Sequence, residues 1–143
     1  MNQLQAGPFT TVDAIIEING GIVVIERSNP PFGFALPGGF VDYGESLEDA
    51  CRREAKEETG LEITDLKQFH TYSQPQRDPR FHTIGTVYLC RASGTPKAGD
   101  DAAGLKIIKL NEIENREFAF DHKKILQDYL CYKQGKDPFS SER

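Results

Sequence analysis

The chain lacks the features that would assign it to a membrane or to a disulfide-bonded secreted protein. It has no tryptophan, one methionine and three cysteines among 143 residues. No apolar run approaches the roughly 20 residues of a transmembrane helix, so we expect no membrane partner. The first residues, MNQLQAGPFTTVD, have neither the basic nor the apolar region of a secretory signal. Cys51, Cys90 and Cys131 are scattered and odd in number, so the simplest interpretation is reduced thiols in the cytoplasm.

An excess of basic residues is also missing. The formal net charge is −5, which argues against nonspecific binding to nucleic acid but leaves room for a small phosphorylated ligand held by a few cations or a metal. The length and the 38% hydrophobic content fit one domain with its own core. We predict a single domain over residues 1–143, with a core at about 10–133 and a frayed tail at about 135–143.

The hydrophobic periodicity predicts strands before, after and around one central helix. Asn19-Gly20-Gly21 is a strong hairpin signal between two apolar runs. Ser46 is an expected N-cap and Gly60 an expected C-terminal stop of the central helix, and Asp121 is expected to cap a last helix. The predicted strands are 12–18, 21–27, 66–72, 83–91 and 105–110. The predicted loops are 28–39, 73–80 and 93–103. The apolar stripe of the last helix consists of Ile125, Leu126, Tyr129 and Leu130. This order favours an α/β domain with a mixed sheet covered by helices.

The helix at residues 46–59 carries three carboxylates in an unusual place. On a wheel of about 100° per residue, the core face holds Leu47, Ala50, Cys51 and Ala55, and the solvated face holds Glu48, Asp49, Arg52, Lys56 and Thr59. Glu54, Glu57 and Glu58 cluster on an arc that overlaps the core face, where they repel one another. Arg53 or a divalent cation such as Mg²⁺ can compensate. The alternative is an acidic helix end in water, and spacing does not choose between the two.

The segment from Gly38 to Leu61 resembles the Nudix box. That pattern is a glycine, a glutamate after five residues and, after seven more, R-E-U-x-E-E-x-G-U with U aliphatic; here Gly39, Glu45 and REAKEETGL fill it. Ala55 is smaller than the usual aliphatic. The resemblance implies an α/β/α sandwich and a hydrolase that cuts a diphosphate linkage in a nucleoside diphosphate derivative, with Mg²⁺, or alternatively Mn²⁺, as its metal.

The same resemblance assigns roles to the residues of the box. It implies that the Gly38 carbonyl and Glu54, Glu57 and Glu58 hold the metal or activate water. Arg53 would orient a glutamate, and Glu45 would brace Arg53. Gly38 and Gly39 would let the loop backbone approach the metal, which suits a residue without a side chain.

Three further segments, FALPGGFVDYGES, YSQPQRDPRFHTI and FAFDH, look like the subgroup of Nudix enzymes that act on ADP-ribose. Cutting ADP-ribose would give AMP and ribose 5-phosphate, and related enzymes are often homodimers. One departure is Gly104, where the subgroup commonly has a glutamate after an Asp-Asp pair. Asp100 and Asp101 remain, so the base could be one of them, Glu57 or Glu58.

Several other residues are candidates for contacting the substrate. Arg77 and Arg80 could grip a diphosphate or lie in a solvated loop. Arg27 is a candidate phosphate contact and His82 a candidate substrate contact, each with a structural alternative. Phe32 and Phe34 could stack a base or be buried, while Asp121 and His122 fit helix capping. Two functional alternatives stay open: a non-catalytic ADP-ribose-binding module, and a Nudix enzyme for oxidised nucleoside triphosphates or nucleotide sugars.

Overall fold

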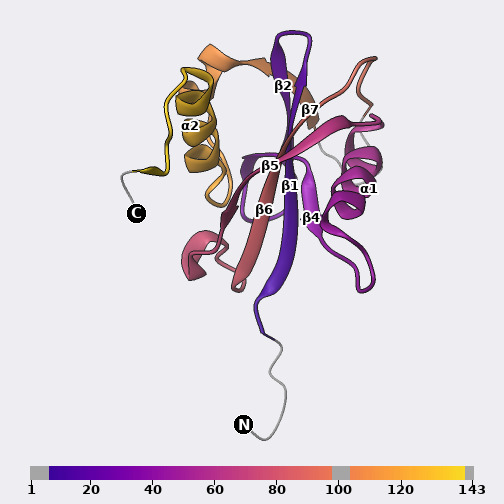
Figure 1. The fold of residues 1–143 in the computed structure, drawn as a ribbon, viewed down its shortest axis with the longest axis vertical. Helices are drawn as coiled ribbons and strands as arrows, with labels where there is room; N and C mark the ends of the chain where they lie inside the picture. Colours follow the sequence, from indigo (N-terminus) through magenta and orange to yellow (C-terminus); the bar gives the residue numbers. More distant parts are fainter. Residues whose placement is uncertain (1–6, 98–103, 141–143) are drawn as a thin grey trace, which may run out of the picture.

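A mixed seven-stranded sheet lies between two helices in the computed structural model, which describes residues 7–97 and 104–140 (Figure 1). The strands are β1 (Phe9–Ile18), β2 (Gly21–Arg27), β3 (Gly33–Ala35), β4 (Gly38–Phe40), β5 (Thr64–Tyr72), β6 (Thr83–Arg91) and β7 (Gly104–Lys109). The helices are α1 (Leu47–Thr59) and α2 (His122–Lys133), with short 3₁₀ turns η1 (Pro75–Arg77) and η2 (Leu110–Asn115). The predicted α/β/α sandwich is confirmed.

The sheet is built around a parallel pair. Its main path runs β3-β2-β1-β6-β5, with β4 paired to β1 and β7 paired to β2. Only β1 and β6 are parallel among the described pairs, and the remaining pairs are antiparallel. β1 therefore contacts β2, β4 and β6, and it connects the two halves of the sheet.

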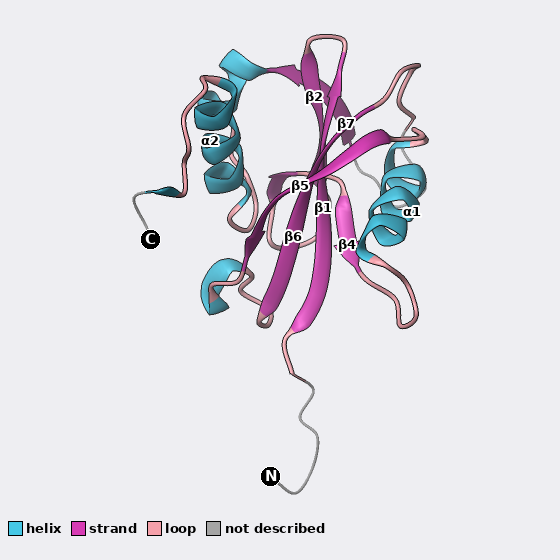
Figure 2. Ribbon diagram, viewed as in Figure 1, coloured by secondary structure: helices cyan, strands magenta, loops and turns pink. Residues whose placement is uncertain are grey.

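Alternating side chains of β1 separate two hydrophobic cores. Val12, Ala14 and Ile16 pack with the buried face of α1, whereas Ile15 packs with α2. Figure 2 shows the two helices on opposite sides of the sheet. The period of two in a strand places successive side chains on opposite faces, so one apolar strand serves both helices.

The predicted hairpin and the ends of α1 are confirmed. Asn19 (φ 50°) and Gly20 (φ 77°) form the two-residue turn between β1 and β2. The backbone N–H of Asp49 donates to the Ser46 hydroxyl, and Gly60 ends the helix in the left-handed region with φ 73°. These are the local interactions that N-caps and C-terminal glycines provide.

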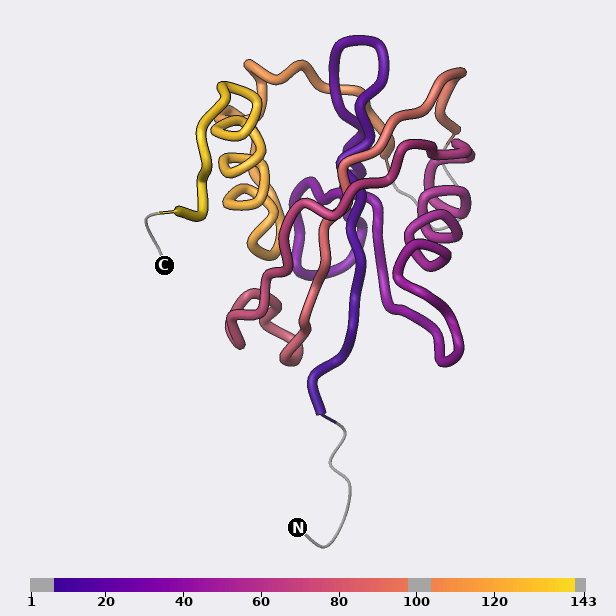
Figure 3. Tube along the Cα trace, in the orientation of Figure 1, coloured from indigo at the N-terminus to yellow at the C-terminus, as the bar shows by residue number. Residues whose placement is uncertain are grey.

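Three local predictions are wrong. Residues 28–39 are not all loop, because β3 lies within them and β4 begins within them at Gly38. Thr59 is not solvated but fully buried, since its hydroxyl donates to the Ala55 carbonyl and accepts from the Leu61 N–H. Residues 135–140 are not frayed, because Phe139 stacks on His70 with centroids 3.7 Å apart, and Figure 3 shows this segment running back beside α2. None of the described helices is long and apolar enough to cross a membrane.

Arg77 and Asp121 join two distant parts of the chain. Arg77 donates from Nε and Nη2 to the Asp121 carboxylate, both at 2.9 Å, and from Nη1 to the Thr83 hydroxyl at 2.8 Å. The Arg77 side chain is 4% exposed. Asp121 makes no side-chain cap on α2, which corrects the predicted capping role: its carboxylate is engaged by Arg77 instead.

We expect Arg77→Ala to lower the free energy of unfolding by about 3 kcal/mol, because it leaves the Asp121 carboxylate without its partner in a largely buried position. Urea unfolding measures this directly. Arg52→Ala is the control, since the exposed Arg52–Asp49 pair should contribute less than about 1 kcal/mol. Equal stability of the two variants would contradict the structural role of Arg77.

Candidate functional site

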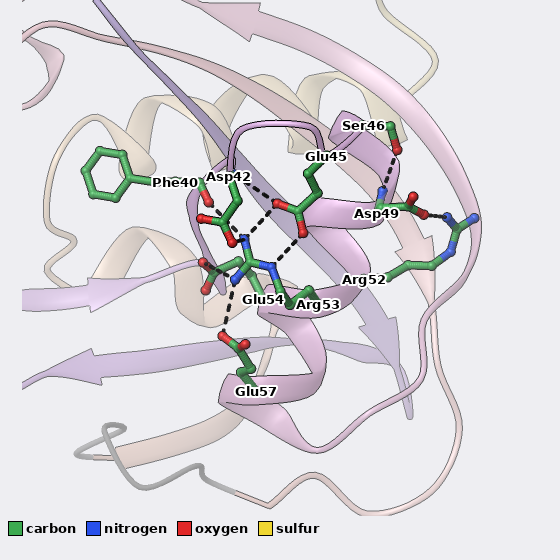
Figure 4. Close-up of polar contacts among 9 residues, drawn as sticks. All are labelled: Phe40, Asp42, Glu45, Ser46, Asp49, Arg52, Arg53, Glu54 and Glu57. Atoms are coloured by element: carbon green, nitrogen blue, oxygen red, sulfur yellow. Dashed lines mark hydrogen bonds and ion pairs between the residues drawn. The ribbon is translucent and has the colours of Figure 1, made fainter.

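Arg53 is the centre of a network of acidic groups on α1 and the loop before it (Figure 4). Its guanidinium binds Glu45 in bidentate fashion, with Nε–Oε2 at 2.7 Å and Nη2–Oε1 at 3.0 Å. Nη2 also donates to the Phe40 carbonyl at 3.0 Å, and Nη1 donates to Glu54 at 3.1 Å and Glu57 at 3.4 Å. One side chain therefore connects the loop, β4 and the helix.

This network shifts the pKa values of its members. The hydrogen bonds from Arg53 lower the pKa of Glu45 to about 2. The bond with Glu45 in turn raises the pKa of Arg53 above its usual value. Arg53 is thus held as a cation and Glu45 as an anion, as expected for a rigid bidentate pair. The predicted bracing of Arg53 by Glu45 agrees with this geometry.

The two glycines of β4 bring the backbone against the carboxylates of α1. The Gly38 N–H donates to Glu58 Oε1 at 2.9 Å. A Cβ at Gly39 would collide with the Glu54 carboxylate, and one at Gly38 would collide with the Val12 carbonyl and Asp13. Only glycine allows this approach without displacing a neighbour.

Glu58 and Glu54 are carboxyl groups in a place that disfavours charge. Burial raises the pKa of Glu58 to about 8, with Glu54, Asp13 and Glu57 adding to the effect and the Gly38 N–H opposing it. Burial also raises the pKa of Glu54, although Arg53 opposes this. The side chain of Glu57 is 57% exposed, so the predicted inward arc holds for Glu54 and Glu58 and is wrong for Glu57.

The glutamates form one wall of a cavity of about 460 Å³. Its acidic lining consists of Asp13, Asp42, Glu54, Glu58 and Asp78, and its basic lining of Arg27, Arg77 and Arg80. The remaining lining includes Thr11, Gly38, Gly39, Phe40, Phe120 and His122. A cavity with carboxylates and guanidiniums in one lining can hold a phosphate through the cations and a metal through the anions.

The substrate-contact candidates fall in different places. Arg27 and Arg80 line the cavity, whereas Arg77 lines it with a guanidinium already bonded to Asp121 and Thr83. That pairing gives Arg77 a structural role, and its predicted grip on a diphosphate stays a prediction. His82 is not among the cavity's lining residues, and its Nε2 lies 3.0 Å from the Ser73 carbonyl.

The aromatic and loop candidates lie mostly away from the cavity. Phe32 is 66% exposed and Phe34 packs against the α2 core, so neither lines it. Gly104 begins β7 opposite Glu26 of β2. Asp100 and Asp101 lie outside the described residues, and the identity of the base stays a prediction.

Asp13 and His122 line the cavity, although neither of them was assigned a role in the site from the sequence. Both are buried, with His122 Nε2 3.6 Å from Asp13 Oδ2. His122 Nδ1 accepts from the Leu36 N–H at 3.0 Å, which places the proton of the neutral ring on Nε2, facing Asp13. A carboxylate inside the apolar run VDAIIEI was the signal available for Asp13, because a charged residue is rarely buried without a partner.

The donor set fits a hard divalent cation in its chemistry, since Glu54 and Glu58 offer oxygen ligands and, of the two, only Glu54 is paired with a cation, Arg53, among the described residues. Within residues 7–97 and 104–140, no group of three His, Cys, Asp or Glu side chains is already arranged to hold a metal. Glu57 instead contacts Arg53. The lining therefore supplies carboxylates for a cation, but their oxygens are not gathered around one point among the described residues.

Comparisons with known proteins agree with this site. The chain is 46% identical over 136 residues to an ADP-ribose pyrophosphatase of Methanocaldococcus jannaschii, covering 93% of this chain and 79% of the relative. The NUDIX domain of Shewanella oneidensis NrtR, solved in complex with ADP ribose, superposes with a TM-score of 0.79 at 26% identity, covering 86% of each chain.

A third relative is the bifunctional NMN adenylyltransferase/ADP ribose pyrophosphatase of Francisella tularensis, solved with AMP and a manganese ion. It superposes with a TM-score of 0.77 at 30% identity, covering 89% of this chain and 42% of that chain. The family model of the NUDIX domain matches residues 7–129. With the box, the sandwich and the glycine–glutamate contacts in place, the chain belongs to the NUDIX family.

Proposed function

We propose that the chain hydrolyses the diphosphate linkage of ADP-ribose to AMP and ribose 5-phosphate, with Mg²⁺ as its metal and Mn²⁺ as a substitute. The observation that carries this proposal is the cavity itself, where the buried carboxylates of α1 lie in one lining with Arg27 and Arg80. The relative from Methanocaldococcus jannaschii, named an ADP-ribose pyrophosphatase, supports this choice of substrate.

The residues of this chain divide the work between binding and activation of water. Arg27 and Arg80 would bind the diphosphate oxygens, and Glu54 and Glu58 with the Gly38 carbonyl would hold the metal. A bound Mg²⁺ supplies neutralisation of the phosphate oxygens and a lower pKa for coordinated water. Glu57, Glu58, Asp100 or Asp101 would accept the proton of the attacking water, while Arg53 keeps Glu54 in position. Water adds to one phosphorus, and the bridging oxygen leaves with the other phosphate.

The carboxylate assignment predicts a loss of turnover on neutralising Glu58. Glu58→Gln keeps the shape of the side chain and removes its charge, so kcat for ADP-ribose should fall by at least ~10²-fold. Glu62→Gln is the matched control, because the Glu62 side chain is 82% exposed and pairs only with Lys56 among the described residues. Glu48 is unsuitable, since it accepts from the buried Tyr88 hydroxyl. Unchanged turnover in Glu58→Gln would exclude a catalytic role for Glu58.

The buried charge also predicts a pH-dependent stability without metal. The pKa of Glu58 is about 8 in the folded protein and 4.5 ordinarily. Its contribution to stability is therefore complete below the ordinary pKa and is lost as the pH rises through about 8. In EDTA, wild type should lose stability relative to Glu58→Gln by on the order of a few kcal/mol between about pH 5 and about pH 8.

Urea unfolding of both proteins across this pH range measures the difference. Saturating Mg²⁺ should reduce it, because the cation stabilises the ionised carboxylate of wild type and gains little from the amide. Parallel pH curves in EDTA, or an equal response of the two proteins to Mg²⁺, would contradict the role of Glu58.

The arginines that line the cavity predict a separate effect on substrate binding. Arg80→Ala should raise KM for ADP-ribose about tenfold, equivalent to ~1.4 kcal/mol, with a smaller effect on kcat because a phosphate contact acts mainly on binding. The Asp78 carboxylate keeps its bond from the Arg80 backbone N–H in this variant. Steady-state kinetics with ADP-ribose and a nucleoside triphosphate side by side test it. A wild-type kcat/KM that favours the triphosphate would change the proposed substrate to a nucleoside triphosphate. Tight ADP-ribose binding without turnover would indicate a non-catalytic ADP-ribose-binding module.

The remaining expectations are also proposals. A homodimer fits the resemblance to ADP-ribose hydrolases, and a cytoplasmic location fits the free state of Cys51, Cys90 and Cys131. The net charge of −5 favours a small nucleotide over nucleic acid as partner.

A further inference from the structure

Phe120 has a backbone conformation that needs an explanation. Three non-glycine residues of the described chain have positive φ: Asn19, Asp65 and Phe120. Asn and Asp adopt this region with little strain, but a bulky aromatic residue at φ 57° is an outlier. Such strain persists where surrounding structure enforces it, and it concentrates at functional sites. Phe120 lines the cavity.

The residues on both sides of Phe120 enforce its conformation. The Ala119 N–H donates to the Phe34 carbonyl at 2.8 Å, and the His122 N–H donates to the Ala119 carbonyl at 3.2 Å. On the other side, the Asp121 carboxylate is held by Arg77. The chain is therefore fixed before and after Phe120, and its ring contributes to the cavity lining.

Two guanidiniums lie over this one ring. Arg27 Cζ is 4.8 Å and Arg80 Cζ 5.2 Å from the ring centroid of Phe120. Arg27 ends β2, whereas Arg80 lies in the loop between β5 and β6, so the ring is a shared contact of two separate elements. The negative face of a phenyl ring attracts each cation. The two cations also repel one another, and burial and the charge of Arg80 lower the pKa of Arg27.

Both guanidiniums keep donors for a ligand. Arg27 uses Nε and Nη2 on the Pro31 and Pro30 carbonyls, and Arg80 uses Nε and Nη2 on Asp78. A guanidinium has five N–H donors. Toward the residues that the structure describes, each arginine therefore has three donors without a bond. Two such forks beside one cavity match the oxygens of two linked phosphates, which would also relieve the repulsion between the cations.

We propose that Phe120 is a positioning residue that holds Arg27 and Arg80 as a preformed clamp for the diphosphate of the substrate. The proposal rests on the proposed function for its substrate, ADP-ribose, but the clamp requires only a diphosphate. The Phe120 ring, together with Asp78 and the Phe81 ring in the case of Arg80, limits where the two guanidiniums can lie before the ligand arrives. This reduces the ordering that binding requires.

Kinetics with ADP-ribose test the clamp through a series at position 120. Phe120→Leu keeps an apolar side chain and removes the aromatic face, so KM should rise about fivefold while kcat changes less than about twofold. Phe120→Tyr keeps the face and should restore KM to within about twofold of wild type. Phe118→Leu is the matched control, since the Phe118 ring lies under Lys123 and does not line the cavity. Equal KM values for Phe120→Leu and wild type would overturn the proposal.

Binding of ADP separates this proposal from the proposed function. ADP has the diphosphate of ADP-ribose without the second ribose. Calorimetry in Mg²⁺ gives the Kd for ADP without turnover. We expect Phe120→Leu and Arg80→Ala each to weaken ADP binding about fivefold or more, and the double variant to weaken it by less than the product, because both changes remove the same clamp. Multiplicative effects would show that Phe120 does not act through Arg80.

The outcomes remain distinguishable if ADP-ribose is the wrong substrate. Wild type that binds ADP but does not cut ADP-ribose would remove the proposed function, and the clamp would then be judged by the ADP data alone. Normal ADP-ribose turnover together with unchanged ADP binding in Phe120→Leu would remove the clamp and leave the function intact. Thermal unfolding of each variant confirms that the comparison is made between folded proteins.

Discussion

The structure depends on a close approach between the backbone of β4 and the carboxylates of α1. Gly38 donates its N–H to Glu58, and Gly39 leaves room for the carboxylate of Glu54. β4 can occupy this place because Gly38 pairs with Asp13 of β1 at the centre of the sheet. The same contact that attaches the helix to the sheet therefore buries two acidic groups beside the cavity.

This burial has an energetic cost that the neighbouring groups distribute unequally. Arg53 compensates Glu45 and part of Glu54, and Arg53 is itself tied to the Phe40 carbonyl. Burial raises the pKa of Glu58 to about 8, and Glu58 has one backbone N–H and no cation in direct contact within the described residues to oppose this. A group kept at a cost to stability is typical of a functional site. The α1 helix thus combines the ion-pair network around Arg53 with one buried carboxyl group, Glu58, that has no cationic partner among the described residues.

The arginines of the cavity lining also divide into one that is paired with a distant carboxylate in the fold and two that keep donors for a ligand. Arg77 uses three of its N–H donors on Asp121 and Thr83 and acts as a buried link between η1, β6 and the start of α2. Arg80 and Arg27 keep donors facing the cavity lining. Arg77 and Arg80 are three residues apart in one loop, yet one supports the fold and the other is available to a ligand, because only Arg77 reaches Asp121.

Local sequence determined much of this protein. The Asn19-Gly20 turn, the strand at 83–91 and the caps Ser46 and Gly60 follow from short-range rules, and the Nudix box indicated the family because its residues lie within one contiguous segment. Tertiary structure decided which of those residues face the cavity. The exposure of Glu57 and the burial of Thr59 depend on how α1 packs on the sheet. The pairing of Arg77 with Asp121 and the meeting of Arg27, Arg80 and Phe120 depend on side chains far apart in the chain. Such contacts leave no periodic signal, since they arise only when β2, the β5–β6 loop and the start of α2 are packed around the sheet.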